Sequence, residues 1–137
     1  MGINLAIFAS MKRYLTILIC AMLCLGAAAA NKTPKSKTFV VNTEKLGKEV
    51  MGYAGTTPVE ITVTDGKIEK IVALPNSETE TFFQRVQESP IFTALIGKTV
   101  KEASEVQLDA VSGATFSSKA VIENIRLGLK EAAKKAK

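Results

Sequence analysis

VEITVTDGKIEKIVAL, residues 59–74, carries the clearest secondary-structure pattern in the chain. Its first half alternates apolar and polar side chains, which is typical of a strand with one buried face. The apolar positions are Val59, Ile61 and Val63. Asp65-Gly66 follows, a pair that is favoured in the two-residue type I′ turn between antiparallel strands. The segment therefore predicts a β-hairpin.

The second half of this hairpin does not keep a regular alternation. Pairing across the turn places Val63 opposite Ile68, which is consistent, but it leaves Ile61 opposite a lysine and Ile71 opposite a glutamate. One extra residue in a strand exchanges its two faces and would return the apolar side chains to the same side. We therefore predict a β-bulge near Glu69–Lys70.

Weaker periodic patterns flank the hairpin. Before it, Thr38–Asn42 fits either a short strand or an extended arm. After it, a helix is expected over Thr79–Glu88, with Phe82, Phe83 and Val86 on one side. A proline follows closely, and the residue before a proline disfavours helical geometry, so this helix should end there.

Two further short elements are expected in the middle of the chain. Proline is favoured at the first position of a helix and glycine just after the last. A short helix is therefore predicted to begin at Pro90 and to end at Gly97. Val106 and Leu108 alternate with a polar residue and suggest a short strand.

The last predicted helix runs from Ser117 to about Ala133. Its apolar residues recur at helical spacing and form one stripe: Val121, Ile122, Ile125, Leu129 and Ala132. Strands and helices do not alternate strictly along the chain, which favours an α+β fold over a doubly wound sheet. We expect a small single domain, with a short antiparallel sheet packed against helices.

Residues 1–30 form a predicted signal peptide. Lys12 and Arg13 precede an apolar run, Tyr14–Leu25, and small residues follow it. The run is short for a transmembrane helix, and small residues suit cleavage. Met11 is a second candidate for the first residue, and an uncleaved anchor is the alternative. We expect an exported protein, in the periplasm or another extracytoplasmic compartment, either free or membrane-associated.

Both cysteines, Cys20 and Cys24, fall within this segment, and the chain has no histidine. The rest of the protein would therefore lack a thiol for disulfide or redox chemistry. The lack of histidine removes the usual ligand of zinc and the usual base of a hydrolytic triad. No metal site is predicted, and a redox role would require a bound cofactor.

After the signal peptide we expect a leader or extended arm over residues 31–50, a folded domain over 51–133 and a basic tail over 134–137. Basic side chains gather at the end of the last helix: Lys130, Lys134, Lys135 and Lys137. Cations there complement the negative end of the helix dipole. A nucleic-acid-binding face would combine basic and aromatic residues. No such pattern is evident, so we expect no nucleic-acid partner.

Asp109-Ala110-Val111-Ser112-Gly113-Ala114-Thr115 directly precedes the last predicted helix. It joins an acid, a turn of small residues and a threonine hydroxyl. The first N–H groups of a helix lack intrahelical partners, and together with the helix dipole they favour a phosphate. Thr115 is therefore a candidate to carry or contact a phosphate. A threonine that only caps the helix is the structural alternative.

These residues resemble the flavinylation signature D-x-x-[ST]-G-A-T of FMN-binding domains, found in the C and G subunits of Na⁺-translocating NADH:quinone reductases and of Rnf complexes, and in small secreted relatives. The resemblance extends from about Met51 to Leu129. It implies a separate flavin transferase, dependent on FAD and Mg²⁺, that attaches FMN to a threonine as a phosphoester. Thr115 matches the acceptor, and Asp109 matches the acid that helps the transferase recognise the site.

The resemblance also implies contacts with the flavin ring. Glu78-Thr79 matches a Glu-Thr pair that the family places near the ring, although Glu80-Thr81 stands here where Pro-Gly is usual. Tyr53 belongs to a Gly-Tyr sequence like the one that opens the family's first strand, and it is a candidate to pack on the ring.

The signature turn contains further candidates. Gly113 and Ala114 leave its backbone accessible to another active site, and glycine also permits a positive φ. Ser112 is a candidate to bond the local backbone or the phosphate. Ser117 and Ser118 are candidate helix caps or phosphate donors.

The combined prediction is an exported electron-transfer domain with FMN attached covalently to Thr115. We expect a carrier between an unidentified donor and acceptor, either of which is soluble or membrane-bound, because no acid or base for substrate chemistry stands out. One alternative is an exported interaction domain with a vestigial signature. Another is a reductase that binds FMN noncovalently, but the sequence contains no G-x-G-x-x-G loop for a nicotinamide cofactor.

Overall fold

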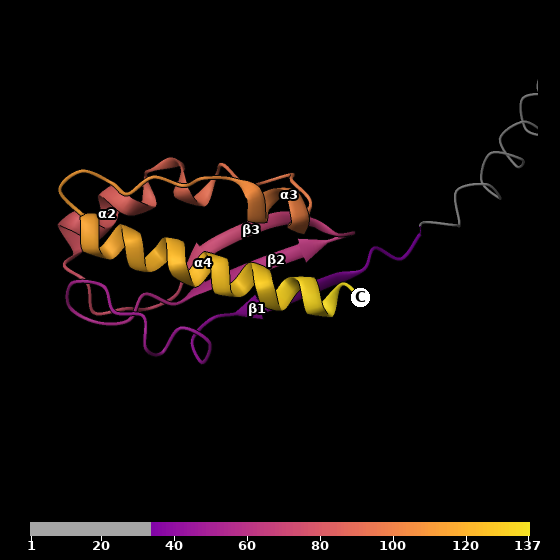
Figure 1. Ribbon diagram of the computed structural model, residues 1–137, viewed down its shortest axis with the longest axis horizontal. Helices are drawn as coiled ribbons and strands as arrows, with labels where there is room; N and C mark the ends of the chain where they lie inside the picture. The colour runs from indigo at the N-terminus through magenta and orange to yellow at the C-terminus, as the bar shows by residue number, and fades with distance from the viewer. Residues whose placement is uncertain (1–33) are drawn as a thin grey trace, which may run out of the picture. The chain divides into compact units, whose positions relative to one another are not determined.

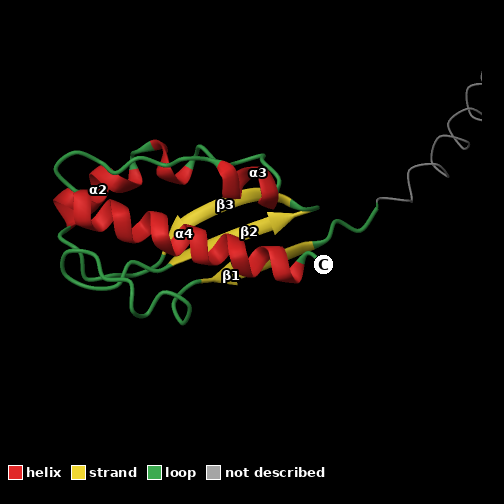
Figure 2. Ribbon diagram, viewed as in Figure 1, coloured by secondary structure: helices red, strands yellow, loops and turns green. Residues whose placement is uncertain are grey.

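The computed structural model describes residues 34–137, and the folded unit comprises Ser36–Lys137. It contains a three-stranded antiparallel sheet in the order β1-β2-β3, with the long helix α4 across one face (Figure 1). The shorter helices lie beyond β3 (Figure 2). The α+β prediction is therefore confirmed. The predicted signal peptide, with both cysteines, lies outside the described residues.

The hairpin is confirmed, with β2 at Val59–Thr64 and β3 at Lys67–Ala73. Both turn residues, Asp65 and Gly66, have the positive φ angles of a type I′ turn, 51° and 77°. The register shifts where Thr62 pairs with Lys70 but Val63 pairs with Ile68. This pairing leaves Glu69 as the extra residue of a β-bulge.

The bulge repairs the packing of the sheet as predicted. It places Ile61 opposite Ile71, so that both side chains face the core and are buried. β1, at Thr38–Asn42, adds a third strand and pairs Val41 with Ile61. Of the two alternatives for Thr38–Asn42, the strand is therefore the correct one.

Two predicted helical segments are present, in shorter form. They are α2, at Glu80–Gln87, and the 3₁₀ helix η1, at Pro90–Phe92. Gly97 ends the turns that follow η1, with a φ of 81°. Phe83 and Val86 of α2 are buried as expected.

The region after Gly97 differs from the prediction. α3, at Val100–Glu105, was missed because a helix of six residues is too short to show a clear periodicity. It begins with a capping box, in which Thr99 and Glu102 each bond the other's backbone N–H. The strand predicted at Val106–Leu108 is wrong. These residues are outside any strand, and their apolar side chains pack against the core from a loop.

α4 spans Thr115–Lys135 and begins two residues before the predicted start. Its predicted stripe is buried against the sheet, as Val121 and Ile125 illustrate with no exposed surface. Each buried side chain of this size contributes about 1.5–3 kcal/mol, so the stripe holds α4 in place along its length. Within residues 34–137, the helices are too short or too polar to span a bilayer.

Candidate functional site

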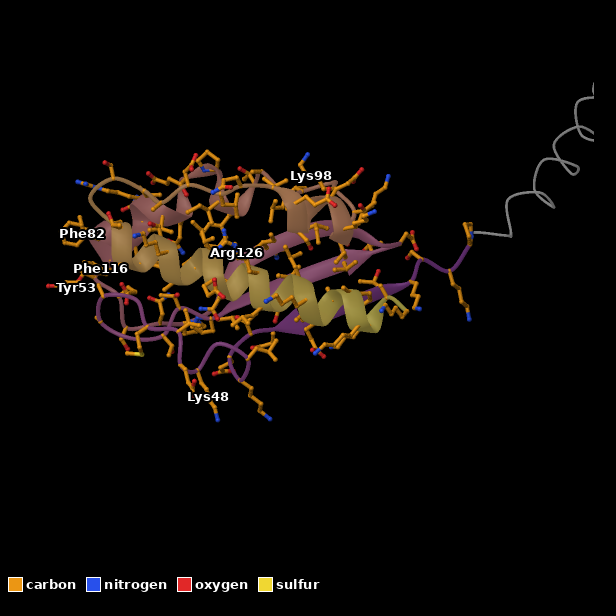
Figure 3. The ribbon with its side chains drawn as sticks, in the orientation of Figure 1. Lys48, Tyr53, Phe82, Lys98, Phe116 and Arg126 are labelled. Carbon is orange, nitrogen blue, oxygen red and sulfur yellow. The ribbon has the colours of Figure 1, made fainter. Side chains whose placement is uncertain are left out.

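A cavity of about 360 Å³ lies at the N-terminal end of α4. Its walls come from three separate parts of the chain: the loop before β2, the start of α2 and the signature turn. The lining residues are Tyr53, Glu78, Thr79, Phe82, Gly113, Ala114, Thr115, Phe116 and Ser117. Three of these are labelled at this end of the molecule in Figure 3. The volume is within the usual range for small-molecule sites.

Thr115 is the first residue of α4, and its side chain is exposed at the cavity. The N-cap position is held by Ala114, which has no side chain to bond the helix. The threonine hydroxyl therefore does not cap α4, and it makes no hydrogen bond to any residue within 34–137. The capping alternative for Thr115 is wrong.

The backbone at this helix end leaves donors for a ligand. The first hydrogen bond of α4 runs from the N–H of Ser118 to the carbonyl of Ala114, 2.9 Å. The N–H groups of Thr115, Phe116 and Ser117 precede it and have no acceptor in the helix. With the positive end of the helix dipole, they favour an anion at this point.

Ser117 and Ser118 are buried and do not cap the helix either. The Ser118 hydroxyl accepts the backbone N–H of Val111 at 2.9 Å and donates to the carbonyl of Thr115 at 3.2 Å. The Ser117 hydroxyl donates to the carboxylate of Glu78. The two serines therefore fix the signature turn and α4 in relation to their neighbours, and only Ser117 lines the cavity.

Glu78 is the centre of this local network. Its carboxylate accepts the backbone N–H groups of Tyr53 at 3.2 Å, Ala54 at 2.8 Å and Gly55 at 3.1 Å, besides the Ser117 hydroxyl. Burial raises the pKa of this carboxyl, but the Ser117 hydroxyl and the three N–H groups lower the pKa by more. The net pKa lies below its ordinary value, so Glu78 is ionised.

The same contacts tie the tip of the loop before β2 to α4. A Cβ on Gly52 would lie 2.6 Å from Oε1 of Glu78, so a larger residue there would displace the carboxylate. Glu78 therefore holds two cavity walls together, and its predicted place at the cavity comes with a structural role that the sequence did not indicate. Thr79 lines the cavity beside it as the N-cap residue of α2.

Three exposed aromatic side chains surround the cavity: Tyr53, 74% exposed, Phe82, 46%, and Phe116, 67%. Tyr53 was a candidate, whereas Phe82 and Phe116 were missed. We had expected Phe82 on the buried side of α2 with Phe83, but adjacent residues of a helix point about 100° apart, and only Phe83 reaches the core. For Phe116, the sequence feature that indicates a place at the cavity is its position directly after the signature.

Two other candidates do not line this cavity. Asp109 is exposed and lines a different shallow cavity, with Lys119 and Arg126 among its other lining residues. Ser112 is exposed in the signature turn and is not among the residues that line the cavity at Thr115. Seven of the sequence-predicted residues therefore line one cavity, whereas Asp109, Ser112 and Ser118 do not.

Comparison with known proteins gives one family. A search of curated proteins found no match. The family model described as the FMN-binding domain matches residues 52–130, more than half of the chain. That range contains every residue that lines the cavity. The chain therefore belongs to the FMN-binding domain family.

Proposed function

We propose that this protein is an exported electron carrier with FMN attached covalently to Thr115 through its phosphate. The observation that carries the proposal is the state of the Thr115 hydroxyl. It is exposed at the mouth of a cavity, it bonds no residue within 34–137, and it stands at the positive end of α4. In an FMN-binding domain, that placement suits a phosphate ester.

The residues present fit both parts of FMN. The free N–H groups of Thr115, Phe116 and Ser117 suit the phosphate. The exposed rings of Tyr53, Phe82 and Phe116 offer flat apolar surface for the isoalloxazine. The carboxylate of Glu78 is already used by four donors, so we assign it to holding the Tyr53 loop rather than to bonding the ring.

The attachment step is a phosphoryl transfer in which Thr115 is a substrate residue. Its Oγ1 forms a bond to the phosphorus of the FMN half of FAD, the bond to the bridging oxygen breaks, and AMP leaves with that oxygen. The hydroxyl proton passes to a base of the transferase. Positioning and a metal that neutralises phosphate charge dominate such transfers, so the transferase supplies the catalysis and Mg²⁺.

Bound FMN supplies one- and two-electron chemistry, which this chain's side chains lack. The chain's part is to hold and orient the group. A tether also keeps the cofactor with the protein outside the cytoplasm, because attachment makes rebinding intramolecular. The exposed aromatic surface around the cavity leaves access for a donor and an acceptor.

The test is to produce the full chain with and without an FMN transferase and to compare intact mass after denaturation. We expect a mass gain of FMN less water, with visible absorbance that survives denaturation. Thr115→Ala should abolish both, whereas Thr99→Ala, outside both the signature and the cavity lining, should keep both. Colour that is lost on denaturation would indicate noncovalent binding. An unchanged mass without colour would support the interaction-domain alternative.

A further inference from the structure

We propose that Arg85 is the counter-ion of the flavin phosphate at Thr115. Arg85 is in the last turn of α2, thirty residues before the threonine, and no sequence motif marks it. This inference rests on the proposed function, because it concerns the phosphate of FMN at the same cavity. It adds a binding residue whose charge would balance that of the phosphodiester.

The first observation is where the guanidinium lies. Nη1 of Arg85 is 2.9 Å from the point where a Cβ on Gly113 would stand. Gly113 has a φ of 80°, lines the cavity and is two residues before Thr115. The arginine therefore lies against the signature turn, in space that only glycine leaves open.

The second observation is how the side chain is oriented. Cζ of Arg85 is 5.9 Å from the centre of the Phe82 ring, within cation–π range. Phe82 itself lines the cavity. Arg85 is not itself a lining residue, but its guanidinium lies beside two residues that are, Phe82 and Gly113. Packing against them lowers the entropy lost when it binds an anion.

The third observation is that Arg85 has no anionic partner among residues 34–137. The structure contains only one other arginine in that range, Arg126, and it pairs with Glu123 at 3.6 Å. Arg85 forms neither a salt bridge nor a side-chain hydrogen bond there. A guanidinium presents a planar set of donors that matches phosphate oxygens. The N-terminus of α4 is two residues after Gly113 and adds a second source of positive potential at the signature turn.

The experiment distinguishes contacts with the phosphate from contacts with the flavin ring, by comparing FMN with riboflavin. In a Thr115→Ala background, where no ester forms, FMN and riboflavin are titrated against the full chain by flavin fluorescence. The proteins compared retain Arg85 or carry Arg85→Lys, Arg85→Gln or Arg126→Gln. The measured quantity is the preference for FMN, the Kd of riboflavin divided by that of FMN.

We expect Arg85→Gln to lower the preference for FMN roughly 3- to 10-fold, as for a partly exposed charged hydrogen bond. The Kd of riboflavin should stay the same. Arg85→Lys should retain part of the preference, and Arg126→Gln all of it. Added salt should reduce the preference more where Arg85 is present than in Arg85→Gln. Equal weakening of both ligands, or equal preferences in Arg85→Gln and Arg126→Gln, would overturn the proposal.

A second measurement covers the case in which noncovalent binding is too weak to titrate. The ³¹P resonance of the loaded Thr115 protein should move in Arg85→Gln and not in Arg126→Gln. An identical resonance in both refutes the contact. Loss of loading in Arg85→Gln alone would place the arginine in the transfer from FAD and would also overturn the proposal. Failure of the parent protein to gain mass would instead refute covalent attachment, independently of the titrations.

Discussion

The N-termini of α3 and α4 can be compared directly, because a threonine stands at the start of each helix. Thr99 caps α3 and accepts the N–H of Glu102 at 3.2 Å, while Glu102 accepts the N–H of Thr99 at 2.9 Å. At α4 the cap is Ala114, and Thr115 stands one position later with its hydroxyl unused. The α3 end satisfies the N–H groups of Val100 and Glu102 within the protein. The α4 end leaves its first three N–H groups for a ligand.

The carboxylates at the two ends differ in the same way. Glu102 bonds only within its own capping box, three residues from Thr99. Glu78 reaches α4 from another part of the chain and bonds a serine there instead of capping the helix. At α3, residues close in sequence cap the helix. At α4, a carboxylate from a distant part of the chain positions the helix end but leaves its first N–H groups free for a ligand.

The largest expected contrast is between Thr115→Ala and Thr99→Ala. The first should abolish covalent flavin and leave the free energy of unfolding nearly unchanged, because the Thr115 hydroxyl bonds no residue within 34–137 and does not cap α4. The second should keep flavin. Intact mass and urea unfolding of the unloaded proteins measure both effects. A marked destabilisation by Thr115→Ala would show that its hydroxyl does stabilise the helix.

Glu78→Gln tests whether the cavity walls depend on the long-range carboxylate. The amide group can accept at only one of its two ends, so some backbone N–H groups of the Tyr53 loop lose their partner. We expect a cost of roughly 1–3 kcal/mol in unfolding free energy and weaker FMN binding. Glu80→Gln, two residues away on the exposed start of α2, is the matched control. Equal results for the two variants would contradict the role assigned to Glu78.

Thr99→Ala should have a smaller effect on stability than Glu78→Gln. Loss of an N-cap threonine costs about 1 kcal/mol, and no residue of α3 lines the cavity. Urea midpoints should therefore fall while the flavin fluorescence of the bound state stays the same. An altered FMN affinity in this variant would mean that the two helix ends are coupled.

The smallest effect is the pH dependence of stability. The pKa of Glu78 is lowered in the folded protein, so its contribution is present above the ordinary glutamate pKa and is lost as pH falls through the folded value. The stability difference between the parent and Glu78→Gln should therefore shrink with acidification. Urea titrations over an acidic pH series measure it, and a gap that is constant or grows toward low pH would contradict the ionised network.

The sequence was most informative where contacts are local or periodic. Alternation around Asp65-Gly66 predicted the hairpin, and the slipped phase located the bulge at Glu69, since a strand with one buried face tolerates no other register. The same reasoning does not find α3, which is too short to show a periodicity, and it wrongly predicts that Phe82 is buried. An exposed aromatic and a buried one look the same in sequence.

By itself, then, the sequence determined the hairpin, the apolar stripe of α4 and the signature that marks Thr115, because these depend on spacing along the chain. Only the tertiary structure decided that Thr115 leaves its hydroxyl unused, that Glu78 joins the Tyr53 loop to Ser117, and that Arg85 lies on Gly113. Those contacts join residues many positions apart, and their partners are set only when the packed core brings α2 and α4 together.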